Sequence, residues 1–329
     1  MPPPTSASRH YRRIQRLAAV TISAARRSWQ KMDPARNWEQ QYAEPNGIGT
    51  ELLVLAAAAQ VAAVRESDTY VANVLNELAF GPETTPGVLD TAGFLGVMGD
   101  GRPVESLLEQ TVVKAGQSFN DAASGAGGSM TNQIPGVFDR STAAETALED
   151  AQKFVDRIFH EIVAETARAA ESAASAQRPW VDGWVRMLNP PACSRCVVLA
   201  GQFYLWSDGF ERHPECDCTH IPAPEAAAGD LVIDPDAYFH SLPAAEQDRA
   251  FGKAGAQAIR DGADIAQVVN ARRGMQKAQV FGKDVVTTTS GTVRGRQRGK
   301  VRLMPESIYD EAKDHEDAIR LLKLHGFIF

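Results

Sequence analysis

The sequence predicts an α+β protein that is mostly α: an N-terminal helical bundle followed by a small α+β domain built round a Cys/His-rich hairpin. Three observations predict this class. Apolar residues recur at helical spacing through most of residues 10–176, β-favouring aromatic runs begin after residue 179, and all four cysteines fall between residues 193 and 218. At 329 residues the chain exceeds what one hydrophobic core usually supports, so we expect two domains, 1–178 and 179–329.

Four long helices are expected in the first domain, at about residues 10–31, 50–80, 103–123 and 142–176. The first carries an arginine-rich face that we expect to be solvated, with docking on DNA or on an acidic partner as the alternative. The second is apolar nearly all round, which predicts a place at the centre of the bundle. Ser141 or Thr142 is expected to cap the fourth helix. This half shows no motif with chemistry of its own and is interpreted as a scaffold.

Shorter elements are expected in the second domain. Residues 180–188, a run starting at Phe203, and residues 285–289 have the composition of strands. Helices are expected at 244–261, at 265–272 and at 306–325. The run at Phe203 and the turn after it separate the two cysteine pairs, which is the arrangement of a hairpin that carries a metal.

The cysteines form two close pairs. Cys193 and Cys196 make a C-x-x-C motif, and Cys216 and Cys218 make a C-x-C motif with His213 beside it. Two knuckles of soft ligands separated by a hairpin-length spacer favour a tetrahedral structural Zn²⁺ site held by the four thiolates, with His213 as the substitute ligand. Reduced, buried thiols and a pair of disulfides are the alternatives, and disulfides fit a reducing cytoplasm least well.

A basic, glycine-containing run follows residue 290. Arg294, Arg296, Arg298, Lys300 and Arg302 give a density of positive charge on flexible backbone that suits contact with nucleic-acid phosphates. A solvated loop balanced by nearby carboxylates is the alternative. Because the whole chain has a formal charge of -7, we do not expect it to coat nucleic acid over its entire surface.

The sequence also bears on location. The N-terminus lacks the apolar stretch and cleavage site of an export signal, and the longest apolar run, residues 52–64, is too short to cross a bilayer. We therefore expect a protein made in the cytoplasm, without a membrane partner.

The segment from Cys193 to Cys218 resembles the signature of the Mu F-like phage head morphogenesis (minor capsid) proteins. The resemblance rests on Cys193-x-x-Cys196, Leu199-x-Gly201 and His213-Pro214-x-Cys216-x-Cys218. Residues 245–253 (AEQDRAFGK), 264–274 and 302–309 are similar to the version found in phages of actinobacteria. The resemblance covers about residues 180–329.

Membership of this family implies a minor capsid protein located in the phage head interior at the portal vertex, and in the host cytoplasm during assembly. It implies the portal protein and other head or scaffold proteins as partners, with packaged DNA as a further contact. A zinc-dependent hydrolase or nuclease, or an enzyme of the capsid maturation protease type, is the alternative. We expect no enzyme, because thiolate-rich ligands are typical of a closed structural site and no catalytic motif is found.

Overall fold

The structure is a computed structural model that describes residues 4–87, 89–124, 139–189, 191–205, 218–231, 233–280, 282–290 and 302–329. It divides into two compact units: the helical unit, Pro3–Gly183 with Ile221–Pro224, and the C-terminal unit, Trp184–His220 with Glu225–Phe329. Helices predominate, and the strands form two three-stranded sheets. The class is therefore α+β and mostly α, as predicted.

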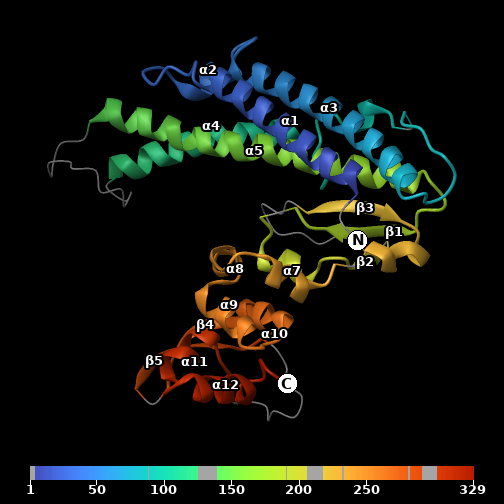
Figure 1. Cartoon of the computed structure of the whole chain (residues 1–329). Coiled ribbons are helices and arrows are strands. Elements are labelled where there is room, and N and C mark those ends of the chain that lie inside the picture. The colour runs from blue at the N-terminus through green and yellow to red at the C-terminus, as the bar shows by residue number, and fades with distance from the viewer. Residues whose placement is uncertain are drawn as a thin grey trace. The chain divides into compact units, whose positions relative to one another are not determined.

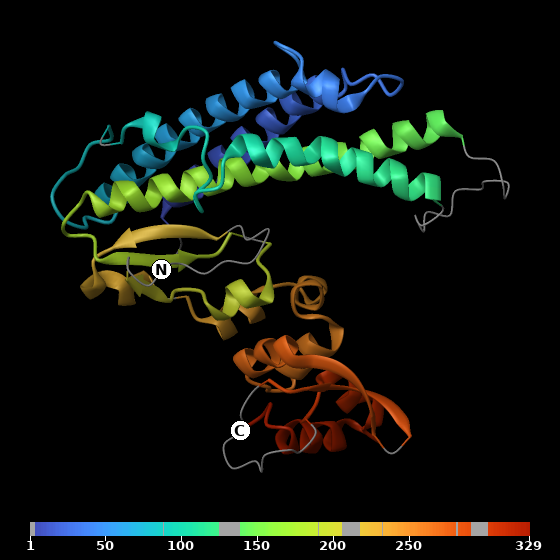
Figure 2. The ribbon, with the colours of Figure 1, turned by 180° about the vertical axis from the view of Figure 1, so that it is seen from behind.

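The helical unit contains four long helices: α1 (Thr5–Trp29), α3 (Ile48–Glu77), α4 (Val104–Ser124) and α5 (Arg140–Ala176). It also contains the short helix α2 (Trp38–Ala43) and the 3₁₀ turn η1 (Thr91–Phe94). The four long ones run side by side (Figures 1 and 2), and α5 contacts α1, α3 and α4. The four helices expected from periodicity are thus present. Asp139, rather than Ser141 or Thr142, caps α5: its carboxylate accepts the backbone N–H of Ser141 at 3.0 Å.

Small apolar residues let the helices approach closely. One cluster of the core joins α1, α3 and α5 through four alanines, one isoleucine and one valine, and a second is built on larger side chains. The first cluster contains Ile14, Ala18, Ala59, Ala63, Val163 and Ala167. Leu52, Leu108, Phe159 and Ile162 anchor the second. The expectation that α3 lies at the centre of the bundle is only half right, because one side of it is covered and Val54 remains 63% exposed.

Among the described residues, α3 is the one helix whose length and composition would suffice to cross a membrane, whereas the apolar run 52–64 taken alone predicts none. The helix is longer than that run and extends from Ile48 to Glu77. Its contacts with α1 and α5 are those of a core helix in a bundle.

Three polar contacts fix the antiparallel register of α1 against α3. The Glu77 carboxylate accepts the backbone N–H groups of Thr5 and Ser6 at 2.7 and 2.8 Å. Near the middle, Arg13 pairs with Glu66 at 3.1 Å. Beyond the C-terminal end of α1, Lys31 pairs with Glu51 at 2.6 Å.

A buried histidine also links the helices of this unit. His10 on α1 is 3% exposed, stacks on the ring of Tyr70 at 4.2 Å, and places Nε2 2.9 Å from an oxygen of Glu171 on α5. Its Nδ1 lies 3.6 Å from Glu66 on α3. Burial lowers the pKa of His10, but the carboxylates of Glu171 and Glu66 outweigh it and hold that pKa above its ordinary value.

The rest of the chain is made of short elements. The helices are α6 (Ser194–Val198), η2 (Glu225–Leu231), α7 (Pro235–Ser241), α8 (Ala244–Phe251), α9 (Lys253–Arg260), α10 (Ile265–Ala271), η3 (Arg272–Gly274), α11 (Pro305–Glu311) and α12 (His315–Leu324). The strands are β1 (Gly183–Met187), β2 (Phe203–Leu205), β3 (Thr219–Ala223), β4 (Met275–Val280), β5 (Lys283–Thr288) and β6 (Arg302–Leu303).

The strands of the first sheet are arranged around β1. The first sheet has the order β2-β1-β3, so β2 and β3 are both neighbours of β1 and not of each other. The turn of the expected cysteine hairpin and the strand that returns from it lie after residue 205, outside the described residues. The second sheet, β4-β5-β6, is antiparallel, with Met275 opposite Thr288 and Thr288 opposite Arg302.

Two of the expected helices are each broken in two. Gly252 separates α8 from α9 with a left-handed φ of 73°, and a side chain there would collide with the guanidinium of Arg272. Asp314 starts α12 by accepting the N–H of Asp317 at 2.8 Å.

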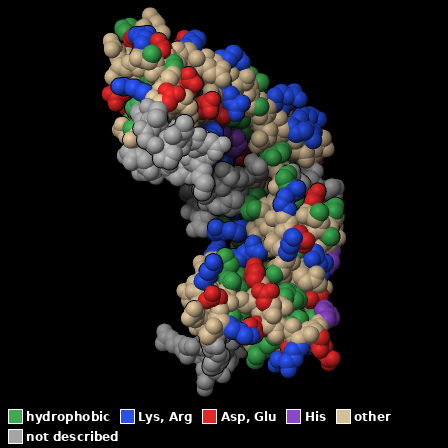
Figure 3. All heavy atoms as spheres, turned by 90° about the vertical axis from the view of Figure 1, so that its left-hand side faces the viewer, with side chains coloured by type: hydrophobic (Ala, Val, Ile, Leu, Met, Phe, Trp, Pro, Cys, Tyr) green, Lys and Arg blue, Asp and Glu red, His purple; other side chains and the backbone are tan. Residues whose placement is uncertain are grey.

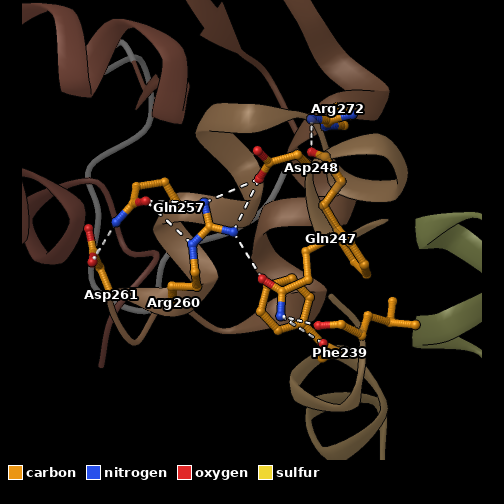
Figure 4. A network of polar contacts seen from close by, with 9 residues as sticks. Phe239, Gln247, Asp248, Gln257, Arg260, Asp261 and Arg272 are labelled. Atoms are coloured by element: carbon orange, nitrogen blue, oxygen red, sulfur yellow. Dashed lines mark hydrogen bonds and ion pairs between the residues drawn. The ribbon is translucent and has the colours of Figure 1, made fainter. Parts of the chain in front are cut away.

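Polar contacts join the two halves of the first broken helix (Figure 4). Arg260 on α9 donates to Gln247 Oε1 at 2.9 Å and to Asp248 Oδ1 at 3.1 Å, both on α8. Gln247 donates in turn to the carbonyl of Phe239 at 3.0 Å, which connects α7 to the same network. Gln247 and Asp248 therefore stabilise the packing of α7, α8 and α9.

Candidate functional site

Three of the four cysteines lie in or against one hydrophobic cluster of the C-terminal unit. Cys196 and Cys218 are 3% and 6% exposed and belong to one hydrophobic cluster, and the half-buried Cys193 packs against it. Cys193 is the N-cap of α6, and its sulfur accepts the backbone N–H of Cys196 at 3.5 Å. The C-x-x-C pair thus forms a compact turn in which the first sulfur already receives a backbone hydrogen bond.

A buried cation lies beside these thiols. Arg186 on β1 is 1% exposed, and its guanidinium carbon lies 5.5 Å from the centre of the Tyr204 ring on β2. Burial lowers the pKa of Arg186, whereas the neighbouring Tyr204 hydroxyl and Cys218 thiol raise it, with a net rise. A guanidinium in the core beside Cys218 puts positive charge where a thiolate would need it.

The strands around the cysteines are fixed by further buried contacts. The Asn189 side chain donates to the hydroxyl of Thr219 at 2.7 Å, which ties the end of β1 to the start of β3. His220 on β3 is 5% exposed and stacks on Trp184 of β1 at 5.3 Å. The ring of His220 therefore packs against an indole inside the sheet.

A small cavity opens next to the half-buried thiol. It has a volume of about 230 Å³, and Cys193, Tyr238, Glu246 and Arg249 are among the residues that line it. Burial raises the pKa of Tyr238, and the charge of Glu246 adds to this rise. Of the three described thiols, Cys193 is therefore the one with access to a solvent-sized space.

The donor set of the expected zinc site is only partly described. Cys216 and His213 lie outside the described residues, and Cys193, Cys196 and Cys218 form no disulfide with one another. Within the described ranges, no three His, Cys, Asp or Glu side chains are arranged to hold a metal ion. Two features nevertheless suit a thiolate-bound metal: the N–H donated to the Cys193 sulfur, and the buried charge of Arg186, which would offset the negative charge of a thiolate cluster.

The expected nucleic-acid contact must be corrected at one position. Arg294, Arg296, Arg298 and Lys300 lie outside the described residues. Arg302 is 3% exposed and does not belong to a basic surface. Its guanidinium donates to the carbonyls of Ser290 (2.9 Å), His325 (2.9 Å) and Gly326 (3.2 Å) and to Gln267 Oε1 (3.2 Å), and it stacks on Phe327 at 4.2 Å. A side chain with its donors used inside the protein is not available to a phosphate.

The face drawn in Figure 3 agrees with the modest net charge of the chain. Lysine and arginine side chains are interspersed there with aspartate and glutamate and do not form one continuous basic field.

The sequence did not predict the role of Arg186. The available signal was one charged residue inside the otherwise bulky run Gly183–Met187, whose five residues are all buried.

Comparisons with known proteins do not assign the chain to a family. No family model matches it, and no curated protein or solved structure shows significant similarity to it.

Proposed function

We propose that the chain is a minor capsid (head morphogenesis) protein of the Mu F-like type, acting by binding inside the phage head. The observation that carries this proposal is the pattern of Cys193, Cys196, Leu199, Gly201 and Cys218, which resembles the family signature. The convergence of the three described cysteines in one core supports a structural use of that pattern. A chain that combines a unit of long helices with a compact unit containing the cysteines also suits a protein that holds partners together.

The proposed partners follow from this role. The helical unit would engage the portal protein or other head and scaffold proteins, because it presents long exposed helix faces. The run from Arg294 to Lys300 would contact packaged DNA through its phosphates. The protein would be made in the host cytoplasm and retained in the virion near the portal vertex.

We also propose that a structural Zn²⁺ ion staples the C-terminal unit. Cys193, Cys196, Cys216 and Cys218 would be its ligands, with His213 as the substitute. The three described thiols are not grouped around a common point, so binding would have to draw them together, and the charge of Arg186 would offset the thiolates. When bound, the ion would supply folding energy and no reaction step, since a four-coordinate thiolate-rich site has no open position.

The portal association is tested by co-expressing the full chain with the portal protein of the same genome and sedimenting the product. We expect the two to migrate together, with a fixed ratio of copies across the peak. A chain that sediments alone in the presence of portal, scaffold and major capsid proteins would contradict the assignment. The matched control is the C-terminal unit variant Arg302→Ala, which should leave contacts of the helical unit intact.

The metal is tested by measuring zinc and accessible thiols in protein purified without chelator. One zinc per chain, with thiols that react only after denaturation, is the expected result. Cys193→Ser should lower the zinc content and destabilise the C-terminal unit alone. Four reactive thiols and no zinc would remove the zinc proposal and leave the capsid proposal standing on the signature.

The DNA contact is tested through its salt dependence. Binding of duplex DNA should weaken steeply as salt rises, because each neutralised phosphate releases counterions. Replacing Arg294, Arg296 and Arg298 by glutamine should flatten this dependence, whereas Arg273→Gln, an exposed arginine on η3, should change it little. Affinity that is absent, or insensitive to salt, would exclude DNA as a partner.

A further inference from the structure

A solvent-exposed seam runs along α1 and α3 on the outside of the helical unit. We call it the α1–α3 groove and define its apolar residues as Val20 and Ala24 on α1 and Val54, Leu55 and Ala58 on α3. Val20 and Val54 are 62% and 63% exposed, which makes them the most exposed large aliphatic side chains described in either helix. At one end lies a cavity of about 680 Å³, lined by Ala24, Val54 and Leu55 and by the polar side chains of Arg27, Ser28, Lys31, Asn46, Thr50 and Glu51.

The register of the two helices places these residues along one line. Val20 lies two helical turns from both Arg13 and Arg27, and Ala24 lies one turn beyond it, so the four share a face of α1. On α3, Val54 and Ala58 are four residues apart and share a face in the same way. Because Arg13 pairs with Glu66 and Lys31 pairs with Glu51, these faces of α1 and α3 border the same groove between the two pairs.

The charges around the groove that have no ion-pair partner are positive. Helix α1 contains no acidic residue, and α3 contains none between Glu51 and Glu66. Both of those glutamates are already paired with Lys31 and Arg13. Arg16, Arg27 and Arg65 are exposed at the rim, and no carboxylate among the described residues forms an ion pair with them. The groove therefore has an apolar floor and a rim with uncompensated positive charge.

The apolar residues of the groove and the arginines around it together indicate which kind of partner can bind there. An apolar floor offers nothing to a phosphate backbone, and it suits the apolar face of an amphipathic helix. Small side chains at Ala24 and Ala58 allow such a helix to approach closely. The uncompensated arginines favour a helix whose flanks carry glutamate or aspartate. From Glu51 to Arg65 the groove is about 21 Å long, which matches a partner helix of about four turns.

We propose that the α1–α3 groove binds an amphipathic α-helix of a partner protein, with its apolar face on Val20, Val54 and Ala58 and its acidic flanks beside Arg16, Arg27 and Arg65. The binding site is a property of the helical unit and does not rest on the proposed capsid role. A negative result here would leave the portal, zinc and DNA experiments unaffected.

The test uses the full chain and two synthetic four-turn helical peptides. Both peptides carry leucine at positions of helical spacing; one has glutamate on its flanks and the other has lysine. Fluorescence anisotropy should show the glutamate peptide binding with a dissociation constant below about 100 µM, the range of weak helix-in-groove contacts. The lysine peptide should bind at least about tenfold more weakly, since like charges face each other across the rim.

Matched variants locate the site. Val54→Asp should weaken binding of the glutamate peptide by about tenfold or more, because it buries a carboxylate against the peptide's apolar face. Val113→Asp, at an exposed valine on α4, should not change it. Arg27→Glu should weaken binding by about threefold, the effect of a rim charge, while Arg273→Glu should leave it unchanged.

Several outcomes would overturn the proposal. Failure of the glutamate peptide to bind, equal binding of both peptides, or equal loss in Val54→Asp and Val113→Asp would each do so. Displacement of the peptide by duplex DNA would assign the groove to nucleic acid. Self-association of the wild type in sedimentation that is lost in Val54→Asp would assign it to a second copy of the chain.

Discussion

The helical unit and the C-terminal unit differ in how most of their elements are held together, although the helical unit also contains a buried guanidinium, that of Arg178. In the helical unit the same contact is repeated along several helices, through alanines such as Ala18, Ala63 and Ala167 that are nearly or fully buried. In the C-terminal unit the elements are short, and a few buried cations join them. Arg186 reaches a thiol and a phenol, and Arg302 joins β6 to the end of the chain.

This difference predicts where each unit is vulnerable. A repeated contact spreads its stabilisation over many positions, so each substitution removes a small share of it. A buried arginine concentrates several hydrogen bonds in one side chain, and its loss leaves several carbonyls without a donor. The four predictions below test this contrast, from the largest expected effect to the smallest.

The largest effect is expected from Arg302→Ala in the C-terminal unit. It should lower the free energy of unfolding of that unit by about 4 kcal/mol, because the carbonyls of Ser290, His325 and Gly326 lose a charged donor in the interior. Hydrogen exchange followed by mass spectrometry should show faster exchange in β5, β6 and α12 and none in α5. Arg320→Ala, at a 64% exposed arginine, should have a much smaller effect. Equal effects of the two variants would remove the contrast between the units.

A pH-dependent effect is expected from His10→Gln in the helical unit. Since the folded-state pKa of His10 is raised, its stabilisation is fully present below the unfolded value of 6.5 and is lost as pH rises through the folded value. Wild-type stability should therefore fall from pH 6 towards pH 9. The variant should lose about 2 kcal/mol at pH 6, the size of a hydrogen bond to a charged group, and less at pH 9.

Thermal unfolding of the helical unit at several pH values checks this prediction. His240→Gln, at a 53% exposed histidine of the C-terminal unit, is the matched control and should leave the pH profile unchanged. A wild-type profile that is flat above pH 6, or one unaltered by His10→Gln, would show that Glu171 and Glu66 do not hold the proton on His10.

A smaller loss is expected from overpacking the alanine seam. Ala63→Leu inserts three carbon atoms where Ala63 is fully buried between α1 and α5, and should destabilise the helical unit by about 1–3 kcal/mol. Ala58→Leu on the exposed side of the same helix should be close to neutral. Urea unfolding of both variants would separate the two cases. A neutral Ala63→Leu would mean that the seam is loosely packed.

The smallest loss is expected from Asp264→Ala, at the N-cap of α10. Its carboxylate accepts the backbone N–H of Gln267 at 2.7 Å, and removing it should cost about 1 kcal/mol. Asp264→Asn keeps the acceptor and should retain most of the stability. The comparison shows how little a local contact contributes in this unit beside Arg302.

The same contrast explains what could be predicted from sequence. The helices of the first half were found because a stripe repeated at helical spacing is visible in any window of the chain. The coverage of α3 was predicted wrongly. Its residues are apolar nearly all round, and only the number of neighbouring helices decides that Val54 stays exposed.

The C-terminal unit was predicted less well because its contacts join residues far apart in the chain. In the sequence Arg302 belongs to a basic run, and no neighbouring residue indicates that its guanidinium donates hydrogen bonds to the carbonyls of His325 and Gly326. Strand β4 was missed, since its sequence MQKAQV is polar and becomes a strand by pairing with β5. The spacing of the cysteines predicts a shared metal, which stays a prediction, whereas the buried Arg186 near Cys218 was not predicted.

The three polar contacts between α1 and α3 also have a mechanical consequence. They lie at both ends and near the middle of α1, between Glu77 and Thr5, Glu66 and Arg13, and Glu51 and Lys31. A force that slides α1 along α3 would load all three contacts at the same time. The two helices should therefore resist sliding along their axes more than they resist separation that begins at one end.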